Sequence, residues 1–151
     1  MVYESQVKEL HFVDDSDTEI LITKMILKKD DVSVDLHSYV KASDFFEHLE
    51  RDAEQHRDTS LVVFDLNLGI GTGIEAIRSL RSDRRFDDLI VGICSGSDDP
   101  KDERDALNAG ADFFVTKPLR GASLEKICSA VASLTYDASP GQPARIFRSS
   151  A

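Results

Sequence analysis

Residues 61–73 read LVVFDLNLGIGTG, and this stretch carries the main signal for the fold. It opens with four apolar residues, 61–64, and an acidic residue, Asp65, follows them directly. A short, uninterrupted apolar run is typical of a strand that is buried on both faces of a parallel sheet. An ionised side chain at the end of such a strand is costly unless it is paired or coordinated. The stretch therefore predicts a central strand that brings Asp65 to a polar site.

Strand-like and helix-like segments alternate on both sides of this stretch. The expected strands cover about residues 8–13, 32–40, 61–64, 89–94 and 112–115, and the expected helices cover about 16–29, 43–55, 73–82, 99–108 and 123–134. Five β-α units in alternation predict an α/β fold, with an open, doubly wound parallel sheet and helices on both of its faces.

The length of the chain fits one domain of this kind. The chain has 151 residues, of which 41% are hydrophobic and 30% are charged, as in an ordinary globular protein. All five units lie within residues 1–135, which we expect to form the domain. Residues 136–151 are rich in Pro, Gly, Ser and Ala, and we expect them to form a flexible C-terminal tail.

The composition argues against several classes of function. A net charge of −10 disfavours direct binding to nucleic acid, because such binding needs Lys and Arg to neutralise phosphates. No apolar run approaches the roughly 18 residues of a membrane span, and the first residues lack a signal peptide, so we expect a cytoplasmic protein. Cys94 and Cys128 lie in apolar segments, and we expect both to be buried and reduced.

Polar residues stand at the ends of four of the expected strands. Asp14 and Asp15 follow the first strand, and Asp65 follows the third. Ser95 follows the fourth strand, and Lys117 lies just past the fifth. A polar residue after a single strand is more often a cap or a turn residue. The carboxyl ends of parallel strands form the ligand crevice of an open α/β sheet, however, so the joint pattern favours a site there.

The chemistry of this set indicates a phosphoryl acceptor that depends on a cation. Neighbouring carboxylates repel one another and so favour the uptake of a hard cation. Mg²⁺ prefers oxygen ligands and is commonly held by one or two carboxylates. With a cation present, Asp65 can attack phosphorus while Lys117 and Ser95 bind the phosphoryl oxygens.

These motifs resemble the receiver domain of bacterial two-component response regulators, over about residues 7–135. Two of the spacings, thirty residues from Asp65 to the hydroxyl residue and fifty-two to the lysine, equal those of single-domain, chemotaxis-type receivers. The matching positions are the pair Asp14-Asp15, Asp65, Gly73, Ser95 and the pair Lys117-Pro118.

The resemblance implies a flavodoxin-like fold with strand order 2-1-3-4-5 and a role for each acidic residue. Asp65 would accept a phosphoryl group from a phosphohistidine on a sensor histidine kinase or a histidine phosphotransfer protein. Asp15, Asp65 and the backbone carbonyl of Asn67 would bind Mg²⁺ directly. Asp14 would assist through a water molecule and through Lys117.

The resemblance also implies how the signal would leave the domain. Ser95 would move to bind the phosphoryl group, and Phe114 would rotate inward into the space that Ser95 leaves. The face formed by residues 99–108, 112–115 and 123–134 would then contact a downstream protein or a second copy of the chain. Such a domain signals rather than turns over a substrate, so we expect no enzyme activity beyond its own phosphorylation and dephosphorylation. The Lys117–Pro118 bond is expected to be cis.

Three rival functions on the same fold are disfavoured. The glycines at 69, 71 and 73 do not form a dinucleotide-binding loop, because that pattern needs glycine at position 74, which is Ile74. A phosphatase with an aspartate nucleophile needs a second aspartate where the chain has Asn67, whose amide is no general acid. In an FMN carrier, the acidic pair after the first strand would repel the phosphate.

Two further alternatives stay open. The chain could be a receiver-like scaffold that binds partners without being phosphorylated, because the contact face would look the same in sequence. It could also be a piece of a larger regulator or hybrid kinase. Gly69 stands where the resembled family usually has proline, so we expect a more mobile loop after Asp65.

Overall fold

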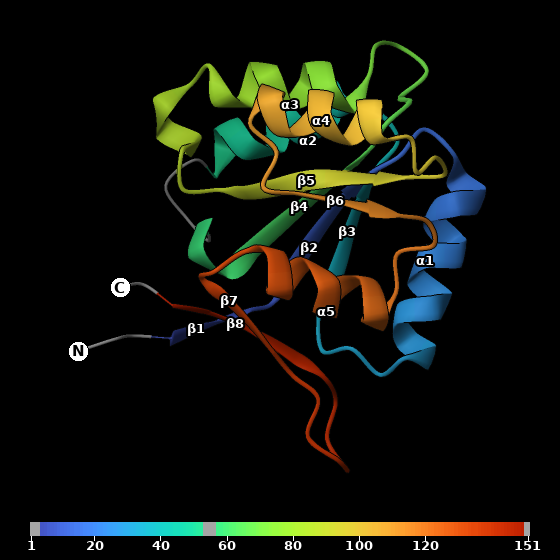
Figure 1. Cartoon of the computed structure of the whole chain (residues 1–151), viewed down its shortest axis with the longest axis vertical. Coiled ribbons are helices and arrows are strands. Elements are labelled where there is room, and N and C mark those ends of the chain that lie inside the picture. The colour runs from blue at the N-terminus through green and yellow to red at the C-terminus, as the bar shows by residue number, and fades with distance from the viewer. Residues whose placement is uncertain (1–3, 53–56, 150–151) are drawn as a thin grey trace.

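The computed structural model describes residues 4–52 and 57–149 of the chain. Five parallel strands form its main sheet, in the order β3-β2-β4-β5-β6 (Figure 1). One additional strand, β1, precedes the first predicted strand, so each strand label is one higher than in the prediction. The predicted order 2-1-3-4-5 is therefore confirmed. The five strands are β2 (Glu9–Val13), β3 (Asp35–Tyr39), β4 (Ser60–Asp65), β5 (Ile90–Ser95) and β6 (Phe113–Thr116).

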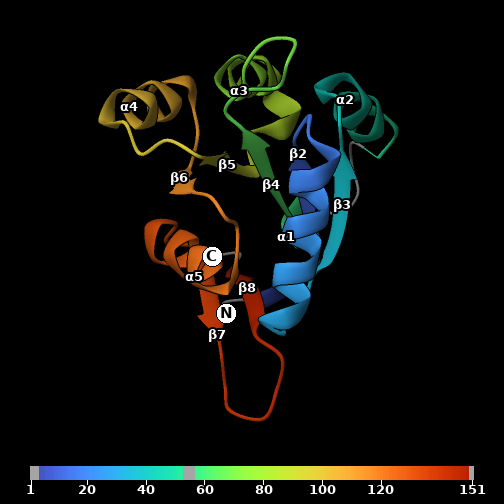
Figure 2. The same cartoon turned by 90° about the vertical axis from the view of Figure 1, so that its right-hand side faces the viewer.

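Helices cover both faces of the main sheet. Helices α2, α3 and α4 lie on one face, and α1 and α5 lie on the other (Figures 1 and 2). The helices are α1 (Asp17–Lys29), α2 (Ala42–Arg51), α3 (Gly73–Arg81), α4 (Pro100–Ala109) and α5 (Gly121–Ala130), with short 3₁₀ turns η1 (Arg57–Thr59) and η2 (Arg84–Phe86). The end of the helix expected at 43–55 lies partly outside the described residues. None of the described helices is long and apolar enough to cross a membrane.

Strand β4 separates two hydrophobic clusters, one on each face of the sheet. Leu61 and Val63 pack with α1 and α5, whereas Val62 and Phe64 pack with α2, α3 and α4. All four side chains are almost completely buried. Burial of such a side chain stabilises the fold by about 1.5–3 kcal/mol. The apolar run that precedes Asp65 is therefore the centre of the core, as predicted.

Capping residues mark the starts of α1 and α4, and a glycine marks the end of α4. Ser16 caps α1 by accepting a hydrogen bond from the backbone N–H of Glu19 at 3.2 Å. Asp99 caps α4 in the same way through the N–H of Lys101 at 2.9 Å. Gly110 follows α4 at a φ of 111°, a left-handed conformation that glycine adopts without strain.

The C-terminal segment differs from the sequence-based expectation of a helix to 134 and a flexible tail from 136. Helix α5 ends at Ala130, and β7 (Leu134–Asp137) and β8 (Arg145–Ser149) then form an antiparallel hairpin (Figure 2). Strand β8 also pairs with β1 (Glu4–Val7), so these strands make a second sheet in the order β1-β8-β7. Residues 150 and 151 of the expected tail lie outside the described residues.

Burial of apolar side chains accounts for this second sheet. Val7, Leu134 and Ile146 all belong to the hydrophobic cluster that also contains side chains of α1 and α5. Because Ile146 is completely buried, the hairpin gains hydrophobic free energy that a solvated tail would lack. Cys94 and Cys128 are both buried and unpaired, as predicted.

Candidate functional site

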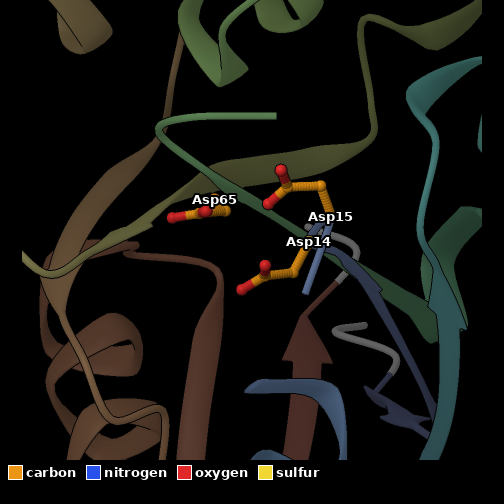
Figure 3. Close-up of side chains that lie close together, drawn as sticks. All are labelled: Asp14, Asp15 and Asp65. Atoms are coloured by element: carbon orange, nitrogen blue, oxygen red, sulfur yellow. The ribbon is translucent and has the colours of Figure 1, made fainter. Parts of the chain in front are cut away.

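Three carboxylates meet at the carboxyl edge of the main sheet. Asp14 and Asp15 follow β2, and Asp65 ends β4, which is the neighbour of β2 in the sheet. One oxygen from each of the three lies within 4.8 Å of the others, and Figure 3 shows the side chains grouped together. Among the described residues, this is the one such group of three or more potential metal ligands.

The three carboxylates differ in their exposure to solvent. Asp14 and Asp65 are buried, whereas Asp15 is exposed. Burial raises the pKa of the Asp65 carboxyl above its ordinary value, and the negative charge of Asp14 raises it further, while Lys117 acts in the opposite direction. The cluster therefore holds uncompensated negative charge and is open to solvent on the side of Asp15.

Lys117 supplies the positive charge of the site. Its Nζ lies 3.0 Å from Asp14 Oδ2 and 3.3 Å from Asp65 Oδ1. Burial lowers the pKa of Lys117, but its hydrogen bond to Asp14 and the charge of Asp65 outweigh burial and raise that pKa above its ordinary value. The side chain is thus an ammonium. The backbone N–H of Lys117 donates to the Ser95 carbonyl at 2.7 Å, and the Lys117–Pro118 peptide is cis.

Backbone contacts hold Asp14 in place. Its Oδ1 accepts a hydrogen bond from the N–H of Ser16 at 3.0 Å, which leaves Oδ2 for Lys117. Its own N–H donates to the carbonyl of Tyr39 at the end of β3, at 3.0 Å. The residue that caps α1 therefore also orients a carboxylate of the site.

Ser95 and Phe114 lie on β5 and β6, the two strands that follow β4 in the sheet order. Ser95 is buried at the end of β5, and its Oγ accepts a hydrogen bond from the N–H of Ser97 at 3.0 Å. Phe114 is half-buried in β6, against the cluster that contains side chains of α2, α3 and α4. Beside Ser95, a Cβ added at Gly96 would meet no atom within 4 Å, so there is open space here.

The loop after Asp65 is shaped by glycines and by Asn67. The Asn67 side chain is exposed, and its Oδ1 accepts a hydrogen bond from the N–H of Gly69 at 3.1 Å. Gly69 has a φ of 77°, and a Cβ there would lie 2.9 Å from Asp15 Oδ2. A Cβ on Gly73 would overlap the carbonyl oxygen of Asp65. Both glycines thus allow the chain to pass close to the carboxylates.

The residues of this edge fit a hard divalent cation. Three carboxylates provide oxygen ligands, and one of them faces solvent, as entry of a hydrated ion requires. Lys117 alone offsets only one of their charges. A bound Mg²⁺ would supply the remaining positive charge.

Sequence reasoning did not identify one charged neighbour of this set, Glu19. Its Oε2 lies 3.9 Å from Lys117 Nζ. The sequence placed Glu19 only in the first turn of the helix expected at 16–29. No local signal reports this contact, because the two residues that form it are far apart in the sequence.

Fold and site together define a flavodoxin-like α/β domain with a carboxylate cluster at the carboxyl edge of its sheet. The chain belongs to the response regulator receiver domain family, whose model matches residues 10–129. It is therefore a signalling domain of the two-component type.

Individual relatives agree with this assignment. The chain is 26% identical over 145 residues to the two-component response regulator ORR1 of Oryza sativa, covering 91% of this chain and 62% of that protein. It is 30% identical over 118 residues to the two-component response regulator PhoP of Pseudomonas aeruginosa, covering 72% of this chain and 51% of that protein. The chain thus spans about half to six-tenths of the length of these relatives.

Solved structures agree on the fold. A two-component response regulator from Cytophaga hutchinsonii matches with a TM-score of 0.73 at 22% sequence identity. The match covers 85% of this chain and 98% of that one.

Proposed function

We propose that the chain accepts a phosphoryl group on Asp65 in a two-component pathway and passes the signal on by protein contact. One observation carries this proposal above the others: the Asp65 carboxylate lies in a group with Asp14 and Asp15 and 3.3 Å from the Lys117 ammonium. This combination of a nucleophile, a cation-binding group and a fixed positive charge suits phosphoryl transfer.

Each carboxylate has a different role in the proposed reaction. Asp15, Asp65 and the backbone carbonyl of Asn67 would hold Mg²⁺, whose charge would offset that of the incoming phosphoryl oxygens. Asp14 assists through a water molecule and by holding Lys117. An oxygen of Asp65 bonds to phosphorus as the P–N bond of the donor phosphohistidine breaks. The imidazole nitrogen keeps the electron pair and takes up a proton.

Ser95 and Phe114 transmit the change. The Ser95 Oγ already accepts a hydrogen bond from Ser97, so its proton is available to a phosphoryl oxygen. Movement of Ser95 towards that group leaves space for the half-buried Phe114 ring to turn inward. Because Phe114 belongs to β6, its movement alters the face formed by α4, β6 and α5. That face would contact a downstream protein or a second copy of the chain.

The donor is a sensor histidine kinase or a histidine phosphotransfer protein. Helix α1 starts two residues after Asp15, so its first turns lie beside the site. Leu21, Ile22 and Met25 of α1 are exposed apolar side chains, which suit contact with a partner that delivers a phosphohistidine. The two unpaired cysteines suit a reducing compartment, so we place this exchange in the cytoplasm.

The test is the mass of the protein after incubation with acetyl phosphate, with Mg²⁺ and with EDTA. The wild type should gain one phosphoryl group with Mg²⁺ only, and Asp65→Asn should gain none. Asp87→Asn is a matched control, because it makes the same change at an exposed position away from the cluster. Beryllofluoride binding is measured in parallel, since some acceptors use small donors poorly.

The alternative is a receiver-like scaffold that acts through the same face without modification. A wild-type protein that neither gains mass nor binds beryllofluoride would favour the scaffold. Modification of Asp65→Asn at the wild-type level would show that the acceptor is another residue.

A further inference from the structure

The Lys117 ammonium has a third carboxylate within reach, besides those of Asp14 and Asp65. It belongs to Glu19 in the first turn of α1, whose Oε2 lies 3.9 Å from Lys117 Nζ. The Glu19 side chain is 41% exposed, whereas that of Asp14 is 1% exposed. Glu19 therefore approaches the ammonium from the solvent side, and Asp14 approaches it from the interior.

Two side-chain hydroxyls hold the backbone of Glu19 in this position. Its N–H donates to Ser16 Oγ at 3.2 Å, and its carbonyl accepts a hydrogen bond from Thr23 Oγ1 at 2.8 Å. Thr23 is buried, and the N–H of Ser16 donates to Asp14. The first turn of α1 is thus tied to the carboxylate that binds Lys117. The backbone of Glu19 is therefore fixed at a position from which its side chain reaches the ammonium.

We propose that Glu19 is a positioning residue that competes with the phosphoryl group for Lys117 and thereby lowers the stability of the phosphorylated state. The inference rests on the proposed function, with the Lys117 ammonium binding the phosphoryl oxygens as expected from the sequence. In the unmodified protein the ammonium bonds Asp14 and lies beside Asp65. When Asp65 carries the phosphoryl group, the ammonium is attracted both to that group and to Glu19. Glu19 draws it towards solvent.

The size of the effect follows from the exposure of the pair. A partly exposed pair with a separation near 4 Å is screened by water, so its strength is that of a surface ion pair. Removal of the Glu19 charge should therefore strengthen binding of a phosphoryl group by about two- to fivefold. The effect should shrink at high ionic strength for the same reason.

The experiment compares three variants with the wild type. Glu19→Gln removes the charge. Glu19→Asp keeps the charge but shortens the side chain, so its carboxylate no longer reaches Lys117. Asp17→Asn is the control, because it removes the same charge from an exposed residue in the same turn of α1. Each folded variant is titrated with beryllofluoride at saturating Mg²⁺, and the half-life of its acyl phosphate is measured.

The expected result is a pattern across the variants. Glu19→Gln and Glu19→Asp should both bind beryllofluoride about two- to fivefold more tightly and keep the acyl phosphate longer, and Asp17→Asn should match the wild type. If Glu19→Asp behaves like the wild type, or Asp17→Asn like Glu19→Gln, the effect is one of general charge and the proposed competition is overturned. The same holds if no Glu19 variant changes either quantity.

Failure of the proposed function looks different. In that case the wild type itself neither binds beryllofluoride nor forms an acyl phosphate, and this inference falls with it. A wild type that is modified on Asp65, together with unaltered Glu19 variants, would refute the role of Glu19 alone.

Discussion

Acidification should destabilise the protein through one buried histidine, His11. Its ring lies close to those of His37 and His48, with centroid distances of 5.2 Å and 5.5 Å, and its Nδ1 is hydrogen-bonded to Tyr39 Oη at 3.1 Å. Glu9 Oε2 lies 3.7 Å from His11 Nε2. Burial, helped by the neighbouring His37 and His48 and opposed by Glu9, lowers the pKa of His11 from 6.5 to about 4.

The sign and size of the effect follow from linkage. The folded-state pKa lies below the unfolded value, so the neutral imidazole contributes stability above pH 6.5 that is lost as the pH falls towards 4. The full shift corresponds to about 3 kcal/mol, because one pKa unit is worth about 1.4 kcal/mol. Between pH 7 and pH 5 the expected loss from this group is about 2 kcal/mol of unfolding free energy.

Urea unfolding at pH 7, 6 and 5 measures this loss. Other groups also titrate, so the relevant quantity is the difference between the wild type and His11→Gln, which cannot gain the proton. The variant is expected to be less stable at pH 7 but to lose about 2 kcal/mol less on acidification. Equal losses in the two proteins would refute the assignment of this pH dependence to His11.

Three further substitutions test packing around the site and in the second sheet. Gly73→Ala places a Cβ against the Asp65 carbonyl, so it should lower the unfolding free energy by about 1–3 kcal/mol and weaken beryllofluoride binding. Chemical denaturation measures the first effect and titration the second. An unchanged protein would contradict the close approach. Gly69→Ala puts a Cβ 2.9 Å from Asp15 Oδ2 in a residue with a φ of 77°, so the affinity for Mg²⁺ should fall. Calorimetry measures this affinity, and an affinity equal to that of the wild type would show that Asp15 adjusts freely. Ile146→Ala empties a completely buried position and should cost about 2–5 kcal/mol in denaturant unfolding, whereas a loss within experimental error would indicate a loosely attached hairpin.

The main sheet could be predicted from the sequence because its signals are local. Apolar runs such as 61–64 mark buried strands, and the polar residues that follow them mark one edge of the sheet. The same reasoning brought Asp14, Asp65 and Lys117 to one place, and their distances in the structure agree with it. The chemical roles assigned to them remain proposals.

The second sheet escaped prediction because its pairing is not local. Val7 pairs with Ile146, at the opposite end of the chain, and neither strand has a long apolar run. The Pro, Gly and Ser residues at 138–143 read as a tail, although they form the turn of a hairpin. Ile146 is followed directly by Phe147 and the pair is flanked by arginines, so the segment shows no clear apolar-polar alternation that would predict a strand.

The contact of Glu19 escaped prediction for a related reason. Its place in the sequence was explained by the helix expected at 16–29, and the structure contains that helix, capped by Ser16. The position of its carboxylate relative to Lys117 depends on how α1 packs beside the end of β6. Such a tertiary distance has no signature in the spacing of residues along one helix.

The pairing of β1 with β8 has a practical consequence for work on this protein. Glu4 lies opposite Ser149, so the two ends of the described chain are neighbours (Figure 1). Strand β1 leads directly into the amino end of β2, whereas Asp65 lies at the carboxyl end of β4. A fluorophore attached at Glu4 or Ser149 would therefore lie on the side remote from the carboxylates. Labels at both positions would report the separation of β1 from β8 without obstructing access to Asp65.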